Sequence, residues 1–144
     1  MRMILAAVLL CSAATAAAHV TVWPKTSAAG AREKYEVRVP NEKDVDTIAV
    51  EVRFPAGLRV NSIEQKSGWR TEPLRNAGGE LIGARWTGQL SPHQFTEFGL
   101  LAINPDAREL TFTASQMYAD GTRVEWSGAP GSKTPAPQVT LSRE

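Results

Sequence analysis

His19 is the residue whose position in this sequence gives it the clearest opportunity for chemistry. It stands in ATAAAHVTVWP, residues 14–24, directly after a run of small residues. If a peptidase cuts between Ala18 and His19, the shortened chain begins with a free α-amino nitrogen beside the imidazole Nδ1. These two nitrogens can close a six-membered chelate ring on one metal ion. An internal histidine cannot do this, because its backbone nitrogen is part of an amide.

Copper is the metal that such a site would suit. An α-amino group has a pKa of about 7.7 to 8.0, so a metal ion displaces its proton at modest cost near neutral pH. Nitrogen donors favour Cu(II), which stands highest in the affinity order of the divalent metals. The competing interpretation is that cleavage happens to fall before a histidine that has no role.

The first eighteen residues predict the cut. Arg2, the apolar run from Ile4 to Leu10 and the small residues up to Ala18 follow the order of a secretory signal peptide, and the segment is too short for a stable membrane anchor. Ala16 and Ala18 supply the A-x-A pattern before His19, with cuts one or two residues earlier as alternatives. We therefore expect a signal peptide over 1–18 and a protein located in the periplasm or secreted.

The composition of residues 19–144 excludes several classes of function. Arg2 is the one charged residue removed, so 15 of the 16 basic residues remain against 15 acidic ones. This balance gives no electrostatic reason to expect nucleic acid as a partner. The single cysteine, Cys11, is removed too, so the fold is not expected to depend on disulfides. With no second long apolar run, we expect a soluble exported domain without a membrane anchor.

Motifs for catalysis are missing as well. The sequence after residue 18 has no cysteine nucleophile, G-x-S-x-G elbow, phosphate loop or C-x-x-C or H-E-x-x-H spacing, and it has only two histidines. We therefore expect a protein that is not an enzyme.

The apolar residues recur mostly with period two, which is typical of half-buried strands. YEVRV (35–39) and TIAVEVRF (47–54) alternate most clearly, and FGLLAI (98–103), apolar on both faces, predicts a central, well-covered strand. Further candidate strands are 57–64, 81–87, 94–103 and 109–118, separated by short breaks rich in Pro, Gly, Asn and Asp. This pattern predicts one all-β domain over 19–144, an antiparallel β-sandwich of immunoglobulin-like type, with a small barrel as the main alternative.

Asp120 and Gly121 predict a hairpin with a two-residue type I′ turn, because both positions of that turn need positive φ. In this register Met117 faces Val124, and Trp126 shares their side of the sheet. The opposite side then carries Leu110, Phe112, Gln116 and Tyr118. Since both sides hold apolar residues, we expect either a bulge or a cover, for which the amino-terminal strand is one candidate.

Several segments in order resemble the YcnI-like copper-binding domain family. They are HVTVWPKTSAAGAREKYEVRVPNEKDVDT (19–47), GW (68–69), GARWTG (83–88), FTEFGLLAINP (95–105), QMYADGTRVEWSG (116–128) and PAP (135–137). The family consists of exported β-sandwich proteins that bind Cu(II) through one amino-terminal histidine, a monohistidine brace. A glutamate helps to hold the metal, and a tryptophan lies close to it.

The resemblance implies a role for three residues. His19 becomes the chelating ligand, Glu42 of VPNEKD the carboxylate ligand and Trp126 of VEWSG the neighbouring tryptophan, with Glu33, Glu36 and Glu51 as substitutes for Glu42. The implied function is copper homeostasis or trafficking, with a periplasmic copper chaperone or a membrane copper transporter as partner. The other tryptophans, Trp23, Trp69 and Trp86, are interpreted as packing or rim residues.

Two other hypotheses belong to different classes. If His93, in the loop SPHQ, reached the same metal, the protein would have the two-histidine brace of a copper-dependent oxygenase. If His19 had no role, the domain would be a metal-free immunoglobulin-like interaction module.

Overall fold

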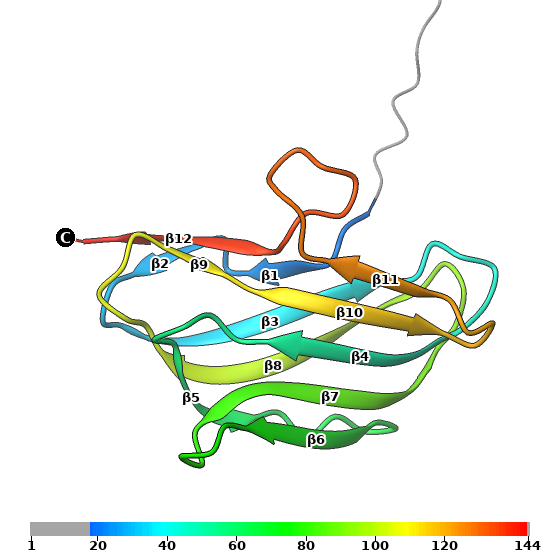
Figure 1. Ribbon diagram of the computed structural model, residues 1–144, viewed down its shortest axis with the longest axis horizontal. Helices are drawn as coiled ribbons and strands as arrows, with labels where there is room; N and C mark the ends of the chain where they lie inside the picture. Colours follow the sequence, from blue (N-terminus) through cyan, green and yellow to red (C-terminus); the bar gives the residue numbers. More distant parts are fainter. Residues whose placement is uncertain (1–17, 144) are drawn as a thin grey trace, which may run out of the picture.

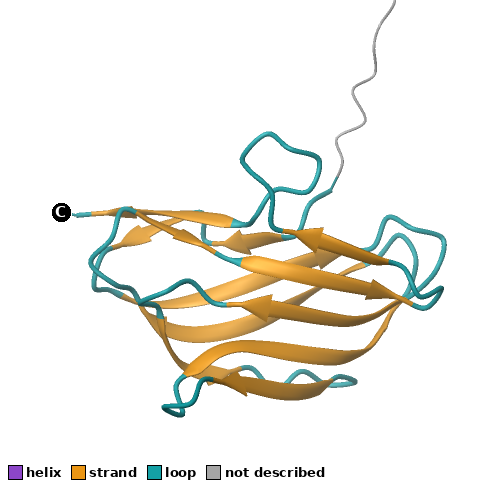
Figure 2. Ribbon diagram, viewed as in Figure 1, coloured by secondary structure: helices purple, strands orange, loops and turns teal. Residues whose placement is uncertain are grey.

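The computed structural model describes residues 18–143, which form twelve strands and no helix (Figures 1 and 2). The strands are β1 (Thr21–Trp23), β2 (Thr26–Ala28), β3 (Arg32–Pro40), β4 (Thr47–Arg53), β5 (Arg59–Ile63), β6 (Arg70–Arg75), β7 (Leu81–Leu90), β8 (Phe95–Ile103), β9 (Glu109–Thr111), β10 (Thr113–Tyr118), β11 (Arg123–Trp126) and β12 (Gln138–Ser142). Consequently no helix in this part of the chain could cross a membrane. The predicted signal peptide lies outside the described residues, apart from Ala18.

Two sheets packed face to face make up the sandwich (Figure 1). One has the strand order β1-β3-β8-β5, and the other has the order β11-β10-β4-β7-β6. A third, three-stranded sheet, β2-β12-β9, closes one side. The strand pairs named here are antiparallel except for β2 with β12, which run parallel. The predicted all-β sandwich is confirmed, and two separate sheets take the place of the alternative closed barrel.

The core between the sheets follows from the alternation in the sequence. Val37 and Val39 of β3 and Val50 and Val52 of β4 are all fully buried, because residues two apart in a strand point to the same side. Trp86 of β7 stacks on Phe98 of β8, with ring centroids 4.4 Å apart and planes 19° from parallel. Such offset aromatic contacts add to the burial of apolar area in joining two sheets.

The predicted register of the hairpin around Asp120 and Gly121 is wrong by one residue. Gln116 pairs with Val124 and Ala114 pairs with Trp126, because Tyr118 faces Thr122 and the loop between them has three residues, 119–121, instead of two. The backbone nitrogen of Tyr118 donates a hydrogen bond of 3.0 Å to the carbonyl oxygen of Thr122. Trp126 therefore shares the inner face with the residues that the prediction had placed opposite to it: Leu110, Phe112, Gln116 and Tyr118, all buried. In this register the large apolar side chains share one buried face, so the bulge or cover that the sequence led us to expect is not needed to explain them.

Two other details of the predicted strands differ in the structure. The pairing of β4 with β7 shifts between Thr47 and Ala49, so Ile48 is turned outward and is 41% exposed although its alternation predicted burial. Strand β8 is central, as predicted, but its outer face is only partly covered. Leu101 on that face is 52% exposed, whereas Gly99 is buried and the side chain of Glu64 lies over it.

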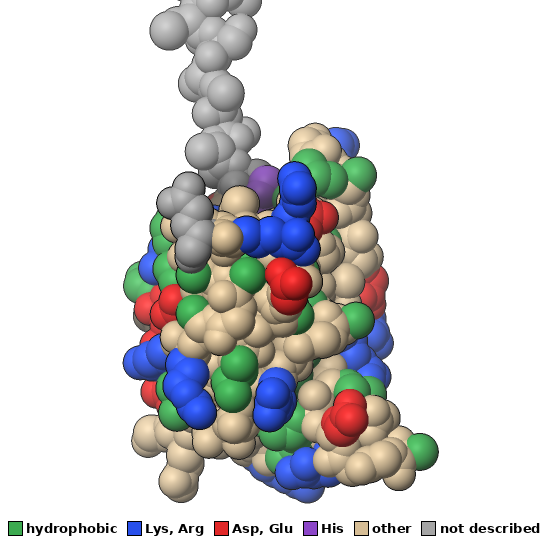
Figure 3. Space-filling view, turned by 90° about the vertical axis from the view of Figure 1, so that its left-hand side faces the viewer, with side chains coloured by type: hydrophobic (Ala, Val, Ile, Leu, Met, Phe, Trp, Pro, Cys, Tyr) green, Lys and Arg blue, Asp and Glu red, His purple; other side chains and the backbone are tan. Residues whose placement is uncertain are grey.

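Charged side chains of both signs are mixed on one face of the molecule. Figure 3 shows Lys and Arg interspersed with Asp and Glu on one face of the molecule, in keeping with the formal net charge of +1 for the full sequence. This face offers no extended basic surface of the kind that binds nucleic acid.

Candidate metal centre

His19 precedes the edge strand β1, and β1 fixes its position. Val20 and Val22 are buried in the core, and Thr21 pairs with Arg38 of β3. Because two buried side chains set both the face and the register of β1, His19 is held at the end of the strand. The same antiparallel register, continued by two residues, brings His19 opposite Pro40.

The ring of His19 lies against Trp126, which comes from the far end of the chain. The two ring centroids are 5.6 Å apart, and the ring planes are inclined by 51°. Figure 1 shows why they meet, since the start of β1 and strand β11 lie side by side at one margin of the sandwich. Trp126 is 7% exposed, so it forms part of the core as well as a wall beside the imidazole.

Glu42 lies in the loop after β3, next to the backbone that precedes His19. Its Oε1 accepts a hydrogen bond of 3.0 Å from the backbone nitrogen of Ala18. That nitrogen belongs to the residue directly before His19. A cut after Ala18 would remove this hydrogen bond and leave the carboxylate close to the new amino terminus.

Asn41 organises the loop that carries Glu42, and sequence reasoning did not single it out. Its side chain is buried, and its Nδ2 donates to the carbonyl oxygens of Val45 at 2.8 Å and Leu90 at 3.0 Å. Its Oδ1 accepts from the backbone nitrogen of Lys43 at 3.0 Å. An asparagine that bonds the backbone two residues on is typical of such turns, and this was the signal available in NEK.

The partners of Lys43 are residues other than Glu42. Its Nζ donates to Thr122 Oγ1 at 2.8 Å and lies 4.3 Å from the centroid of the Tyr118 ring. Within residues 18–143 Glu42 has no salt-bridge partner, so its charge is available to a cation. That charge acts on Tyr118, whose pKa is raised first by burial and then by the carboxylates of Glu42 and Asp120.

The three substitute carboxylates are engaged elsewhere. Glu33 accepts from Ser27 Oγ at 2.8 Å, Glu36 pairs with Lys34 at 2.9 Å, and Glu51 pairs with Arg53 at 3.0 Å. Glu42 is the one of the four candidates that contacts the segment next to His19.

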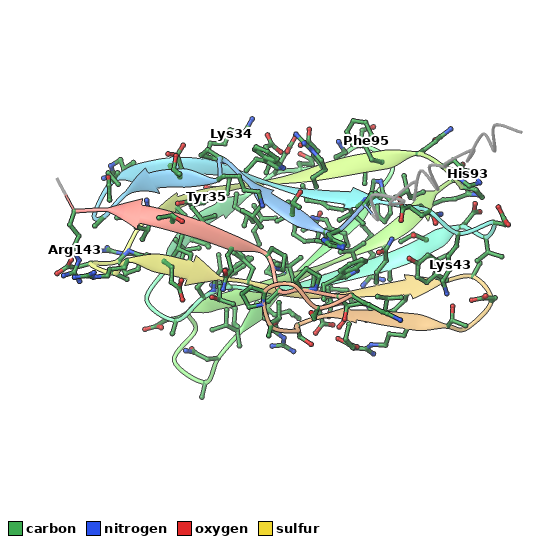
Figure 4. The ribbon with its side chains drawn as sticks, turned by 90° about the horizontal axis from the view of Figure 1, so that it is seen from above. Lys34, Tyr35, Lys43, His93, Phe95 and Arg143 are labelled. Carbon is green, nitrogen blue, oxygen red and sulfur yellow. The ribbon has the colours of Figure 1, made fainter. Side chains whose placement is uncertain are left out.

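His93 is paired with another residue. It has a left-handed backbone with φ of 60°, and its Nε2 lies 3.1 Å from Asp44 Oδ1. Figure 4 shows His93 and Lys43 at the same end of the sandwich as Phe95, with Arg143 at the other end. No group of three or more His, Cys, Asp or Glu side chains that could hold a metal occurs between Ala18 and Arg143. The amine released by a cut before His19 would add a donor that these side chains do not supply.

After a cut before His19, the residues would supply mixed nitrogen and oxygen donors to a small ion. An imidazole, an adjacent amine and one carboxylate are donors that Cu(II) accepts readily. His19 and Glu42 would hold the ion, and Trp126 would limit the access of water on one side.

Comparison with known structures defines the class of the domain. A protein from Nocardia farcinica, described as uncharacterized with an immunoglobulin-like fold, is similar with a TM-score of 0.75 and 31% identity, over 86% of this chain and 98% of that one. A cohesin module of a family 33 glycoside hydrolase from Clostridium perfringens has a TM-score of 0.57 at 12% identity, over 88% of this chain and 97% of that one, a likeness of fold alone. The domain is thus an immunoglobulin-like β-sandwich.

The family follows from the sequence match. A family model described as "Domain of unknown function (DUF1775)" matches residues 19–141, and the chain belongs to this family, the YcnI-like family expected from its motifs. The copper-binding protein CutI of Bacillus subtilis (strain 168) is 36% identical over 131 residues, which cover 88% of this chain and 64% of that protein. The chain therefore spans less than two thirds of the length of this relative.

Proposed function

We propose that this protein binds Cu(II) after export and serves copper homeostasis or trafficking, acting as a metal carrier and not as an enzyme. The ion is held by the amine and the imidazole of His19 and by the carboxylate of Glu42, with Trp126 beside it. The name of the Bacillus subtilis relative supports copper as the ligand. The periplasm, or the outside of the cell, is the compartment that we propose.

One observation carries the proposal: the Glu42 carboxylate lies 3.0 Å from the backbone nitrogen one residue before His19, whose ring contacts Trp126. An amine, an imidazole and an anionic oxygen thus meet at one place once residues 1–18 are removed. The carboxylate also offsets part of the charge of the ion.

A periplasmic copper chaperone or a membrane copper transporter is the proposed partner class. A site at the end of an edge strand and beside an exposed loop can be reached by another protein without opening the core. This partner is inferred from the resemblance to the family and from the exposed position of Glu42.

The experiment compares two proteins that differ in one residue at the amino terminus. One begins at His19, as checked by mass spectrometry, and the other keeps Ala18 ahead of it. Cu(II) titration followed by electron paramagnetic resonance should give one tight site in the first. The site should be lost in the second, because its chelate ring cannot close. Equal binding by both proteins would contradict the brace.

A further inference from the structure

Gln116 of β10 is a polar side chain in the middle of an apolar core. It is fully buried, and every polar atom of its amide has a partner. Its Oε1 accepts from the indole Nε1 of Trp126 at 3.1 Å, and its Nε2 donates to the carbonyl oxygen of Pro40 and to Thr47 Oγ1, both at 2.9 Å. An indole nitrogen can only donate and a carbonyl oxygen can only accept, so these partners fix the amide in one orientation.

The three partners belong to different parts of the candidate site. Trp126 ends β11 and contacts the ring of His19. Pro40 is the last residue of β3, two residues before Glu42, and faces His19 when the register of β1 with β3 is continued. Thr47 begins β4, where the loop that carries Glu42 ends. One side chain thus ties the wall of the site to both ends of the loop that holds the carboxylate.

The need of the Trp126 indole for a hydrogen-bond acceptor does not by itself explain why residue 116 is a glutamine. Burying an amide is costly unless all its hydrogen bonds are made, and an apolar residue would fill the same space in this core. The buried Trp86 Nε1, in the same core, has no hydrogen-bond partner within the described part of the chain. The fold therefore tolerates a buried indole without a dedicated acceptor, whereas Trp126 is given one.

We propose that Gln116 is a positioning residue of the copper site, which holds the Trp126 indole against His19 and anchors the loop of Glu42 through Pro40 and Thr47. The proposal rests on the proposed function, because it assigns Gln116 a role in the same site. Residues that hydrogen-bond to the residues around a metal, without binding the metal themselves, commonly lower metal affinity by about 10- to 100-fold when they are lost.

The test uses the protein that begins at His19 and two variants, Gln116→Leu and the control Asn104→Leu. The side-chain amide of Asn104 is also buried, and it makes hydrogen bonds with Tyr35, Ser27 and Ala28. Asn104 follows the last residue of β8, whereas the candidate site lies near Phe95 at the first residue of that strand. Both substitutions remove a buried network, so both should lower the unfolding temperature. Cu(II) affinity, measured by competition with a chelator, should fall by about tenfold or more only in Gln116→Leu.

Two spectra make the result specific to positioning. In copper-free protein, the ¹H–¹⁵N signal of the Trp126 indole and the ring signals of His19 should move in Gln116→Leu and stay in place in Asn104→Leu. The electron paramagnetic resonance spectrum of the Cu(II) form should change in the same variant only. If Gln116→Leu does not fold, Gln116→Glu, kept as the neutral acid by burial, keeps an acceptor for Trp126 but has one donor in place of two for Pro40 and Thr47. It should then preserve the indole signal and still weaken copper binding.

The outcomes separate the two proposals. If the parent protein binds no Cu(II), the proposed function fails, and the role of Gln116 in it fails too. If the parent binds Cu(II) and a folded Gln116 variant keeps its affinity and both spectra, Gln116 is only a packing residue and the present proposal is overturned alone.

Discussion

The carboxylate of Glu42 and the backbone nitrogen of Ala18 lie 3.0 Å apart across the loop after β3. Ala18 is the last residue that a signal peptidase would remove, and the next nitrogen along the chain belongs to His19. In the uncut chain the carboxylate accepts from an amide nitrogen. In the cut chain it would face an amine and, in the proposed function, a copper ion. Processing would thus replace the partner of Glu42.

Glu42→Gln should weaken Cu(II) binding by at least about tenfold. Loss of a residue that only supports a ligand commonly costs about this much affinity, and loss of the ligand itself should cost no less. The amide keeps the shape of the side chain and removes its charge. Glu36→Gln is the matched control, since Glu36 pairs with Lys34 on the outer face of the sheet. Affinity is measured by chelator competition. Equal affinities for the two variants would mean that the wrong carboxylate was assigned.

His93→Ala should leave the electron paramagnetic resonance spectrum of the Cu(II) protein unchanged. The ring of His93 is paired with Asp44 at 3.1 Å, and Asp44→Asn serves as the control that breaks the same pair from the other side. A spectrum that loses one nitrogen coupling in His93→Ala alone would identify His93 as a ligand and would favour the oxygenase hypothesis.

The two tyrosines should ionise above their ordinary range, and different carboxylates should control them. Burial raises the pKa of Tyr118 and of Tyr35, with Glu42 adding to the first and Glu33 to the second. Glu42→Gln should therefore lower the pKa of Tyr118 alone, and Glu33→Gln that of Tyr35 alone, as measured from phenolate absorbance. Shifts that do not follow this pairing would contradict the placement of Glu42.

The same shifts give the direction of the alkaline stability change. The pKa of each tyrosine is higher in the folded state than in the unfolded state, where it is about 10. The folded state therefore holds these protons more tightly, and their contribution to stability is complete below about pH 10. It is lost as the pH rises through the folded pKa values.

Gly88→Ala should destabilise the fold by about 1–3 kcal/mol, the usual range for overpacking. A β-carbon at Gly88 would lie 2.5 Å from Cδ2 of Trp69, whose ring stands edge-on against Phe98. Gly78→Ala is the control, since its nearest neighbour would be Asn76 Oδ1 at 3.4 Å. Denaturant unfolding measures both free energies. Equal free energies of unfolding for the two variants would show that the Trp69 ring can move away from a β-carbon at residue 88.

Long alternating segments were the predictable part of the fold. YEVRV and TIAVEVRF became β3 and β4, since each has enough apolar residues on one side to define a period. Strands β2, β6 and β12 were not predicted, because three to six residues with Pro or Gly nearby carry too little alternation. The predicted hairpin register is wrong because a three-residue loop, 119–121, was interpreted as a two-residue turn, and one extra residue changes which residues face each other.

The candidate site was predictable only in part. The small residues before His19 indicated where a new amino terminus could lie, whereas Glu42 and Trp126 came from the resemblance to the family. Asn41 and Gln116 were missed, because their importance depends on carbonyl oxygens contributed by other segments. A polar residue inside an apolar alternation, as in TASQMY, is the signal that could have drawn attention to Gln116.

The parallel pairing of β2 with β12 joins a segment near the beginning of the chain to one near its end. Residues 26–28, just after the edge strand that begins near His19, align with residues 140–142. A chain that emerges amino end first would present its histidine early, yet could complete the support behind it only when almost the whole polypeptide is available. The first residue of the proposed binding site would thus be among the last to gain its final surroundings, so a shortened chain would lack them.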